Sequence, residues 1–249
     1  MLSTAANQFI LLEHMVEPLR KNNGEDDVEA IRRIVRDHAE RGWEIVEACG
    51  DEVRMPVLIF RKLALQEGVP EYIIEEIPPA RGEDEIAAVT ERLWQMRDEN
   101  FLPACILDSP ISKPVAVFKK SSKPLTDVRI EVVVVPLVVF ERIGTAIVYE
   151  LLDQQVCKNL TLACIIHGGL NPILVLTAND SGTPYQYLVD YAKSGIFSNK
   201  ATTLATLIQS RTGEGWEVCG AFEDAFLWPC VVFRRKTESV PVAPVEISG

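Results

Sequence analysis

The chain has 249 residues, a formal net charge of −11 and an apolar fraction of 47%, values typical of a soluble globular protein with one large domain or two ordinary ones. The acidic balance argues against a protein that mainly holds nucleic acid, because phosphate binding needs clustered Lys and Arg side chains. The longest apolar run, residues 132–140, is too short to span a membrane, so we expect neither nucleic acid nor a membrane as a partner.

The first predicted elements make up a β-α-β-β unit over residues 1–63, called unit one. Either Asp26 or Asp27 is a suitable N-cap for its helix, and Gly42 is well placed to end that helix. One face of the helix has apolar residues and a histidine at helical spacing: Ile31, Ile34, Val35 and His38. Three apolar runs of strand type flank the helix, at residues 8–13, 43–49 and 56–60.

The same order returns in units two, three and four, over residues 64–121, 122–181 and 182–236. Every third strand begins with a proline, at positions 56, 114, 172 and 229, so the steps are 58, 58 and 57 residues. One apolar helix position in each unit lies twelve residues before the aromatic residue that follows the helix, or before its equivalent (Leu160 in unit three): Ile31, Val89, Val148 and Leu204. Ser198 or Asn199 is the expected N-cap of the last helix. We therefore predict an α+β protein of four β-α-β-β repeats, each with an antiparallel sheet and one helix.

The third strands are apolar at every position, as in residues 57–60. Such strands are normally buried on both faces, but one helix covers only one face of its sheet. The other face must be covered by another unit or by another chain, since its exposure would leave a large apolar patch. We expect two pseudo-symmetric pairs of units, divided near residues 121–124, with the most apolar unit, unit three, in a central or intersubunit position.

Units one and four share a signature at the helix exit and at the end of the third strand. It reads Gly42-Trp43-Glu44 and Phe60-Arg61-Lys62 in unit one, and Gly215-Trp216-Glu217 and Phe233-Arg234-Arg235 in unit four. This signature resembles a small bacterial β-α-β-β family of unknown function. The resemblance implies the fold of a unit and no activity. The basic strand ends, including Lys119-Lys120 in unit two, are expected to be solvated flanks.

No residue spacing in the sequence predicts a catalytic or metal site. The three histidines, His14, His38 and His167, are not at metal-ligand spacing, and phosphate-binding and nucleophile motifs are missing from the sequence. His38, on the apolar helix face, is expected to be a core or edge residue. We therefore expect a non-enzymatic protein without a cofactor.

The six cysteines include no Cys-x-x-Cys pair, so we expect reduced thiols and a cytoplasmic location. A hairpin turn about residues 224–225 would make Cys219 and Cys230 cross-strand neighbours. Two buried thiols are the first interpretation of this pair, and a redox pair is the alternative.

Two segments are candidate interaction sites. Phe226, Leu227 and Trp228 are large apolar residues beside a predicted hairpin tip. The tail, residues 237–249, is expected to be loose or, alternatively, to add as an extended peptide to a sheet of another subunit. The tail residues that would make this contact are Val240, Val242 and Val245.

Two hypotheses for the function follow. The first is a structural or protein-interaction protein that forms a homo-oligomer or docks a protein partner through exposed sheet faces. The alternative is a small-ligand binding or sensing protein with a cleft between its two halves. Aromatic residues such as Trp43, Trp94 and Trp216 would line that cleft.

Overall fold

The computed structural model describes residues 13–50, 56–62, 68–79, 82–107, 113–125, 128–135, 144–156, 159–168, 171–178, 184–192, 199–223 and 228–237. The predicted β-α-β-β order is confirmed in all four units. Units one and two contain β1 (His14–Pro18), α1 (Asp27–Ala39), β2 (Trp43–Cys49), β3 (Val57–Lys62), β4 (Tyr72–Glu76), α2 (Glu83–Asp98), β5 (Phe101–Leu107) and β6 (Val115–Lys120). Units three and four contain β7 (Ile130–Val134), α3 (Gly144–Val156), β8 (Leu160–Gly168), β9 (Asn171–Ala178), β10 (Tyr185–Tyr191), α4 (Lys200–Gly213), β11 (Glu217–Glu223) and β12 (Pro229–Lys236).

The first strand of unit one that the structure shows is β1, which begins at His14. The expected run, residues 8–13, falls almost entirely outside the described residues. The position of β1 is set by its ladder with β3, in which His14 faces Arg61 and Pro18 faces Val57. Tertiary pairing, rather than local hydrophobicity, therefore defines this strand.

Local hydrogen bonds decide where the helices begin. The Asp26 carboxylate accepts a hydrogen bond from the Glu29 amide at 2.8 Å, and the Glu29 carboxylate accepts one from the Asp26 amide at 3.4 Å. This capping box makes Asp26, rather than Asp27, the N-cap of α1. Asn199 caps α4 by accepting from the Ala201 amide at 2.9 Å. Gly42 follows α1 with a φ of 82°, the left-handed conformation expected after a helix.

Each unit has a three-stranded antiparallel sheet with its third strand in the middle. Side chains of a strand alternate between the two faces of its sheet, so the third strand serves two cores. In β3, Leu58 and Phe60 enter the core shared with unit two, whereas Val57 and Ile59 enter the core shared with unit four. This explains why the third strands are apolar at every position.

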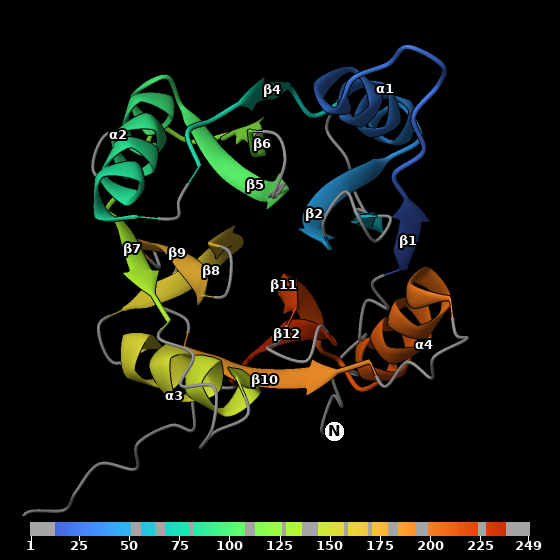
Figure 1. The fold of residues 1–249 in the computed structure, drawn as a ribbon. Coiled ribbons are helices and arrows are strands. Elements are labelled where there is room, and N and C mark those ends of the chain that lie inside the picture. The colour runs from blue at the N-terminus through green and yellow to red at the C-terminus, as the bar shows by residue number, and fades with distance from the viewer. Residues whose placement is uncertain are drawn as a thin grey trace, which may run out of the picture.

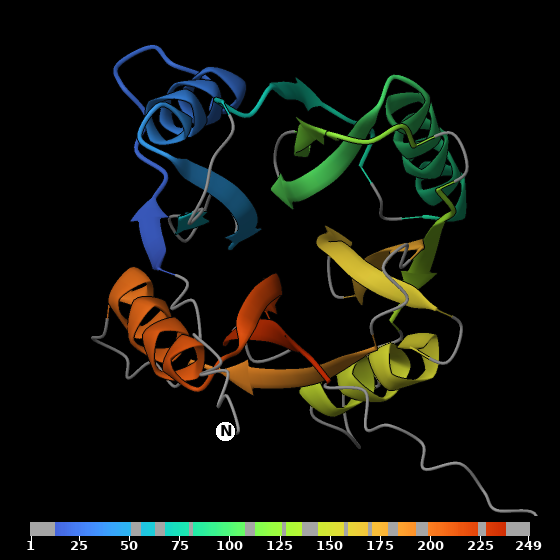
Figure 2. The same cartoon turned by 180° about the vertical axis from the view of Figure 1, so that it is seen from behind.

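The four units form a closed ring (Figure 1), and the view from behind shows the same closure (Figure 2). The second strands β2, β5, β8 and β11 surround the ring axis, and each contacts the second strands of both neighbouring units. Each helix also packs on the first strand of the next unit: α1 on β4, α2 on β7, α3 on β10 and α4 on β1. Unit three therefore occupies a corner like the other units, and its expected central position is wrong.

Each hydrophobic core lies between two neighbouring units. The core that closes the ring combines Leu204 of α4 and Val231 of β12 with Ile59 of β3. Three further cores join units one and two, units two and three, and units three and four. Among the described residues, the second face of each sheet is thus covered by a neighbouring unit of the same chain.

Alternate junctions of the ring differ in one side chain. At the junction of units three and four, the Tyr187 hydroxyl accepts a hydrogen bond from the Leu162 amide at 3.1 Å. At the junction of units one and two, the Tyr72 hydroxyl lies against the Ile45 amide, just outside hydrogen-bond geometry. The equivalent residues at the other two junctions are His14 and Ile130. Tyrosine therefore occurs at alternate junctions, while all four units are joined in one ring, and the expected division into two pseudo-symmetric pairs stays a prediction.

Every second strand has a one-residue bulge at the same place. The residues that it leaves out of the cross-strand ladder are Val46, Ala104, Ala163 and Cys219. The predicted cross-strand pairing of Cys219 with Cys230 is wrong, because the bulge removes Cys219 from the ladder and the hairpin turns later than predicted. Cys230 faces Phe222 instead, and neither thiol forms a disulfide.

Candidate functional site

A cavity of about 890 Å³, here called the axial cavity, lies on the ring axis where the second strands begin. All four units line it, and its volume is in the range of ligand pockets. The four bulge residues all face this cavity, so the bulges shape its wall. The apolar lining consists of Ile45, Val46, Leu102, Pro103, Ala104, Leu162, Ala163, Val218 and Cys219.

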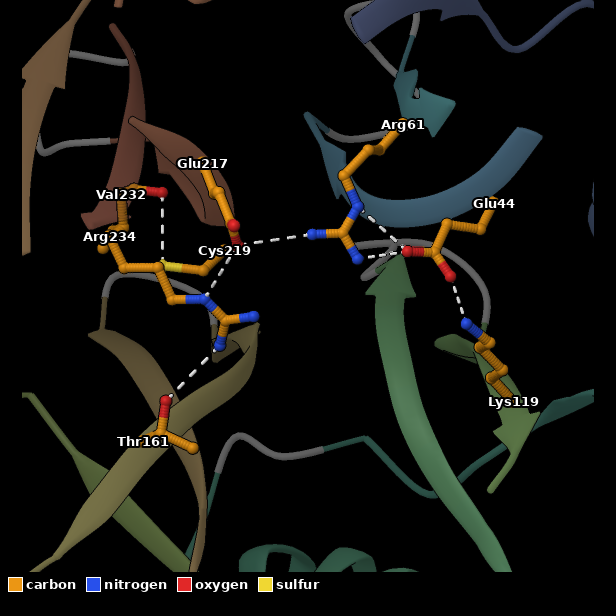
Figure 3. Close-up of polar contacts among 8 residues, drawn as sticks. All are labelled: Glu44, Arg61, Lys119, Thr161, Glu217, Cys219, Val232 and Arg234. Carbon is orange, nitrogen blue, oxygen red and sulfur yellow. Dashed lines mark hydrogen bonds and ion pairs between the residues drawn. The ribbon is translucent and has the colours of Figure 1, made fainter. Parts of the chain in front are cut away.

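A row of charged side chains runs along the cavity from unit two to unit one and on to unit four (Figure 3). It begins at Lys119, whose ammonium group donates to the Glu44 carboxylate. Glu44 also accepts from Arg61, with Nε at 2.9 Å from Oε1. The other side of the Arg61 guanidinium reaches unit four, where Nη1 lies 3.5 Å from Glu217 Oε2.

The row continues through unit four to unit three. Glu217 Oε2 lies 3.5 Å from Arg234 Nε, and Arg234 Nη1 donates to Thr161 Oγ1 at 3.4 Å. The residues from Lys119 to Thr161, here called the axial charge chain, therefore link all four units (Figure 3). These side chains lie close together in space although Glu44 and Arg234 are far apart in the sequence, and closure of the ring explains this proximity.

The axial charge chain is built from equivalent positions of the repeat. Glu44 and Arg61 are cross-strand partners in unit one, as are Glu217 and Arg234 in unit four. The equivalent pairs in the other two units are Leu102 with Lys119 and Thr161 with Thr177. The signature that units one and four share in the sequence thus supplies the two glutamate–arginine pairs of the axial charge chain.

The expectation that the basic strand ends are solvated flanks holds for only one residue of each pair. The second residues, Lys62, Lys120 and Arg235, are exposed. The first residues are partly buried and line the axial cavity: Arg61, Lys119 and Arg234. The exposed Lys120 also lines this cavity. Alternation along the strand explains the difference, because successive side chains point to opposite faces of the sheet.

Glu44 is held as a buried carboxylate. Its side chain is only 3% exposed, so burial raises its pKa, but the charges of Arg61 and Lys119 outweigh burial and hold the pKa below its usual value. Glu44 is therefore ionised at neutral pH and anchors the cations on both sides. Glu217, at the equivalent position, is more open, with a side chain 28% exposed.

The axial cavity carries an excess of positive charge in an acidic protein. Four cationic side chains line it: Arg61, Lys119, Lys120 and Arg234. Two carboxylates line it, Glu44 and Glu71, and Glu217 contacts two of the cations from beside the lining, so cations outnumber carboxylates by one, whereas the whole chain has a net charge of −11. This local reversal of charge favours an anionic occupant.

The described cavity residues supply charges, hydrogen-bond donors and one buried thiol. Cys219 is the cavity's thiol, and burial raises its pKa to about 12. Its thiolate is therefore scarcely populated at neutral pH, and the thiol donates to the Val232 carbonyl at 3.4 Å. The arrangement is suited to holding a ligand.

Glu47 is a second buried carboxyl group, next to the bulge of β2 and away from the cavity lining. It accepts hydrogen bonds from the amides of Ala48 at 2.9 Å and Ile165 at 3.2 Å, and the Ala221 amide also faces it. Burial raises its pKa well above the usual value, which the amide donors only partly offset. Sequence reasoning missed Glu47; an alignment of the four units would have singled it out, since the equivalent residues are Cys105, Cys164 and Gly220.

The predicted interaction residues lie away from the axial cavity or outside the described part. Trp228 is exposed, and its ring stacks on Tyr191 with centroids 5.7 Å apart and planes tilted by 17°. The other predicted interaction residues lie outside the described residues: Phe226, Leu227, Val240, Val242 and Val245. The interaction role of all six stays a prediction.

The tryptophans expected in a cleft do not line the axial cavity. Trp216 is buried with residues of α4 in the core that closes the ring, and Trp43 packs against the core of unit one. Lys62 lies over the Trp43 ring at 5.5 Å and Arg235 over the Trp216 ring at 4.4 Å. The predicted aromatic lining is therefore wrong, because each of these tryptophans points to the face opposite its neighbouring glutamate.

His38 is a core residue, as expected: it is buried, and its ring lies 4.4 Å from that of Phe60. Its Nε2 contacts the Glu17 carboxylate. Within the described ranges, no cluster of His, Cys, Asp and Glu side chains could hold a metal ion. No helix in the described part of the chain is long and apolar enough to cross a membrane.

Comparison with known proteins found no relative of this chain. The chain matches no protein-family model, no curated protein and no solved structure. The resemblance to a small bacterial β-α-β-β family therefore stays a prediction, and the β-α-β-β order itself is what the structure confirms.

Proposed function

We propose that this chain is a binding protein for a small organic anion, which occupies the axial cavity. The observation that carries the proposal is the group of four cations along a cavity with apolar wall residues, to which all four units contribute. An apolar wall suits the body of an organic molecule, and half-buried arginines suit a carboxylate or phosphate group. The expected absence of enzymatic activity is part of this proposal.

The apolar wall would contact the body of the ligand, and the charged residues would bind its anionic group. Bulge residues such as Val46 and Ala163 offer an apolar surface with small side chains, which leaves room for a flat or branched body. Arg61 and Arg234 stand at the ends of neighbouring third strands, where their positions are fixed by the ring. Rigid strands of this kind hold a binding group more accurately than loops do.

Self-assembly or docking of a protein partner is the second candidate. Its original motivation, an uncovered apolar sheet face, is weakened because neighbouring units cover the sheets in the described residues. Trp228 still favours it, since it is exposed and stacked on Tyr191 beside a hairpin. A homo-oligomer or a partner at this surface is compatible with a ligand in the axial cavity.

A panel of naphthalene compounds that differ only in charge tests the proposal. We expect 1-naphthoate and 1-naphthyl phosphate to raise the melting temperature of the protein, because a ligand that binds only the folded state stabilises it. The cation 1-naphthylmethylammonium should have little effect. Equal shifts for the anions and the cation, or a shift for none of them, would contradict the proposal.

Two arginine variants locate the effect. Arg234→Gln removes a cation of the cavity and should reduce the shift caused by the anions. Arg211→Gln is the matched control, because Arg211 forms its ion pairs with Asp190 and Glu214 outside the cavity lining. The control should respond to the panel as the wild-type protein does.

A further inference from the structure

We infer that Arg61 and Arg234 form the anion-recognition pair of the axial cavity, and that Glu217 is a displaceable internal substitute for the oxyanion of the ligand. This inference rests on the proposed function and adds the chemistry of recognition to it. It assigns different roles to the two glutamates of the repeat signature.

The two glutamates are held very differently although their repeat positions are equivalent. Glu44 is 3% exposed and accepts hydrogen bonds from Arg61 and Lys119, including one of 2.9 Å from Arg61 Nε. Glu217 is 28% exposed, and its contacts with both arginines are 3.5 Å long. Charge-assisted hydrogen bonds are ordinarily about 2.7–2.9 Å long. The contacts of Glu217 are longer than this, so its carboxylate is held loosely.

Both arginines keep donor capacity on the side of Glu217. Arg61 uses Nε and Nη2 for Glu44 and turns Nη1 toward Glu217 (Figure 3). Arg234 Nε is buried and makes no hydrogen bond of good geometry, only the 3.5 Å ion pair with Glu217. A buried guanidinium N–H gains from a closer acceptor, since an unmade hydrogen bond of a buried donor is costly.

An oxyanion of a ligand supplies that closer acceptor. Carboxylate and phosphate groups match the fork of guanidinium donors, and a molecule that is not tethered to β11 approaches both arginines more freely than Glu217 does. Glu217 is partly exposed, so water can solvate its carboxylate after the ligand displaces it from the arginines. Glu44 stays in place and keeps Arg61 oriented.

The position of the pair in the ring makes the site directional. Glutamate and arginine occur together only in units one and four, and the equivalent residues of unit two are Leu102 and Lys119. The anionic group is therefore bound at the junction of units four and one. The apolar body of the ligand then extends toward units two and three, over Leu162 and Ala163.

Glu217→Gln tests the inference, because it removes the competing carboxylate and keeps the size of the side chain. We expect 1-naphthoate and 1-naphthyl phosphate to bind this variant roughly threefold to tenfold more tightly than the wild-type protein, as measured by fluorescence titration. Glu217→Ala should tighten binding in the same direction. Glu214→Gln is the matched control, since Glu214 is also paired with an arginine, but that arginine is Arg211, which does not line the cavity, and the substitution should leave the affinity unchanged.

The outcomes separate the inference from the proposed function. Tighter binding by both Glu217 variants, with weaker binding by Arg234→Gln, is the expected result. If the wild-type protein binds the probes and the Glu217 variants bind them equally well or more weakly, the inference is overturned and the proposed function stands. If none of the proteins binds either probe, both are overturned. A preference for one probe identifies carboxylate or phosphate as the better oxyanion.

Discussion

The carboxylate of Glu47 accepts a hydrogen bond from the backbone amide of Ile165, across the ring axis from unit one to unit three. The two atoms are 3.2 Å apart, and the other carboxylate oxygen accepts from the Ala48 amide at 2.9 Å. Units one and three sit diagonally in the ring and are not sequence neighbours (Figure 1). One acidic side chain therefore joins the strand edges that meet at the axis.

Glu47→Gln should change the pH dependence of stability. Burial raises the pKa of Glu47 above its usual value of 4.5, so its contribution is complete below about that pH and is lost as the pH rises through the folded-state pKa. Glutamine is neutral throughout. Above about pH 4.5, the free energy of unfolding of Glu47→Gln should therefore increase relative to that of the wild-type protein, by at most about 1.4 kcal/mol per pH unit.

Urea unfolding at about pH 5 and about pH 8 measures this difference. Glu40→Gln serves as the control for the removal of one carboxylate, because Glu40 is exposed. A difference between Glu47→Gln and the wild-type protein that stays constant over this range would contradict a raised pKa at Glu47.

Glu44→Gln should show the opposite pH dependence. Burial alone would raise the pKa of Glu44, but Arg61 and Lys119 lower it by more than burial raises it. The contribution of Glu44 to the free energy of unfolding is therefore present above its usual pKa of 4.5 and is lost as the pH falls through the folded-state pKa. At neutral pH we expect the substitution to cost about 2 kcal/mol, because it leaves two partly buried cations without their carboxylate.

The cost of Glu44→Gln should shrink in acid, as followed by urea unfolding at neutral and acidic pH. Glu71→Gln is the control: Glu71 and Lys120 form an exposed ion pair, which should contribute less than about 0.5 kcal/mol. A cost for Glu44→Gln that is equally small at neutral pH would mean that the axial charge chain does not stabilise the ring.

Gly220→Ala should destabilise the protein by about 1–3 kcal/mol through overpacking at the axis. A Cβ atom on Gly220 would lie 2.9 Å from side-chain carbons of both Leu162 and Ile165. Gly213→Ala, at the end of α4, is the control, because nothing lies within 4 Å of the added carbon there. Thermal unfolding compares the two variants, and equal melting temperatures would show that units three and four pack less closely than the structure indicates.

The described cysteines should resist labelling in the native protein. Cys49, Cys105, Cys164, Cys219 and Cys230 are buried, and burial raises the pKa of Cys49 and Cys219 to about 12. We expect a thiol reagent such as 5,5′-dithiobis(2-nitrobenzoate) to react with these five only after unfolding. Rapid native labelling of Cys219, identified by peptide mapping, would show that the cavity wall opens.

Much of the fold could be predicted because the repeat is visible in the sequence. The prolines before the third strands fixed the unit boundaries, and the continuous apolar runs, such as residues 57–60, correctly required a cover on both faces. Ring closure could not be derived from these patterns. A strand needs the same apolar residues whether its second face is covered by the next unit, by a paired half or by another chain.

The candidate site was harder to predict because its geometry depends on closure and on the bulges. The basic pair Arg61-Lys62 does not show from the sequence alone which of its two side chains faces the axis. Trp43 suggested an aromatic cavity wall, but the neighbouring Glu44, on the opposite face of the strand, is the residue that lines the cavity. The one-residue bulge at Val46 follows from packing around the axis and has no signature of its own in the sequence. The glutamate–arginine pairs were visible, but only the ring brings Arg61 beside Glu217.

Filling the axial cavity tests the central claim most directly. Ala163→Phe places a large side chain in the cavity from a partly exposed bulge position. Native mass spectrometry should find one 1-naphthoate molecule per 27.8 kDa chain in the wild-type protein and none in a folded Ala163→Phe variant. Equal occupancy of the two proteins would contradict a binding site on the ring axis.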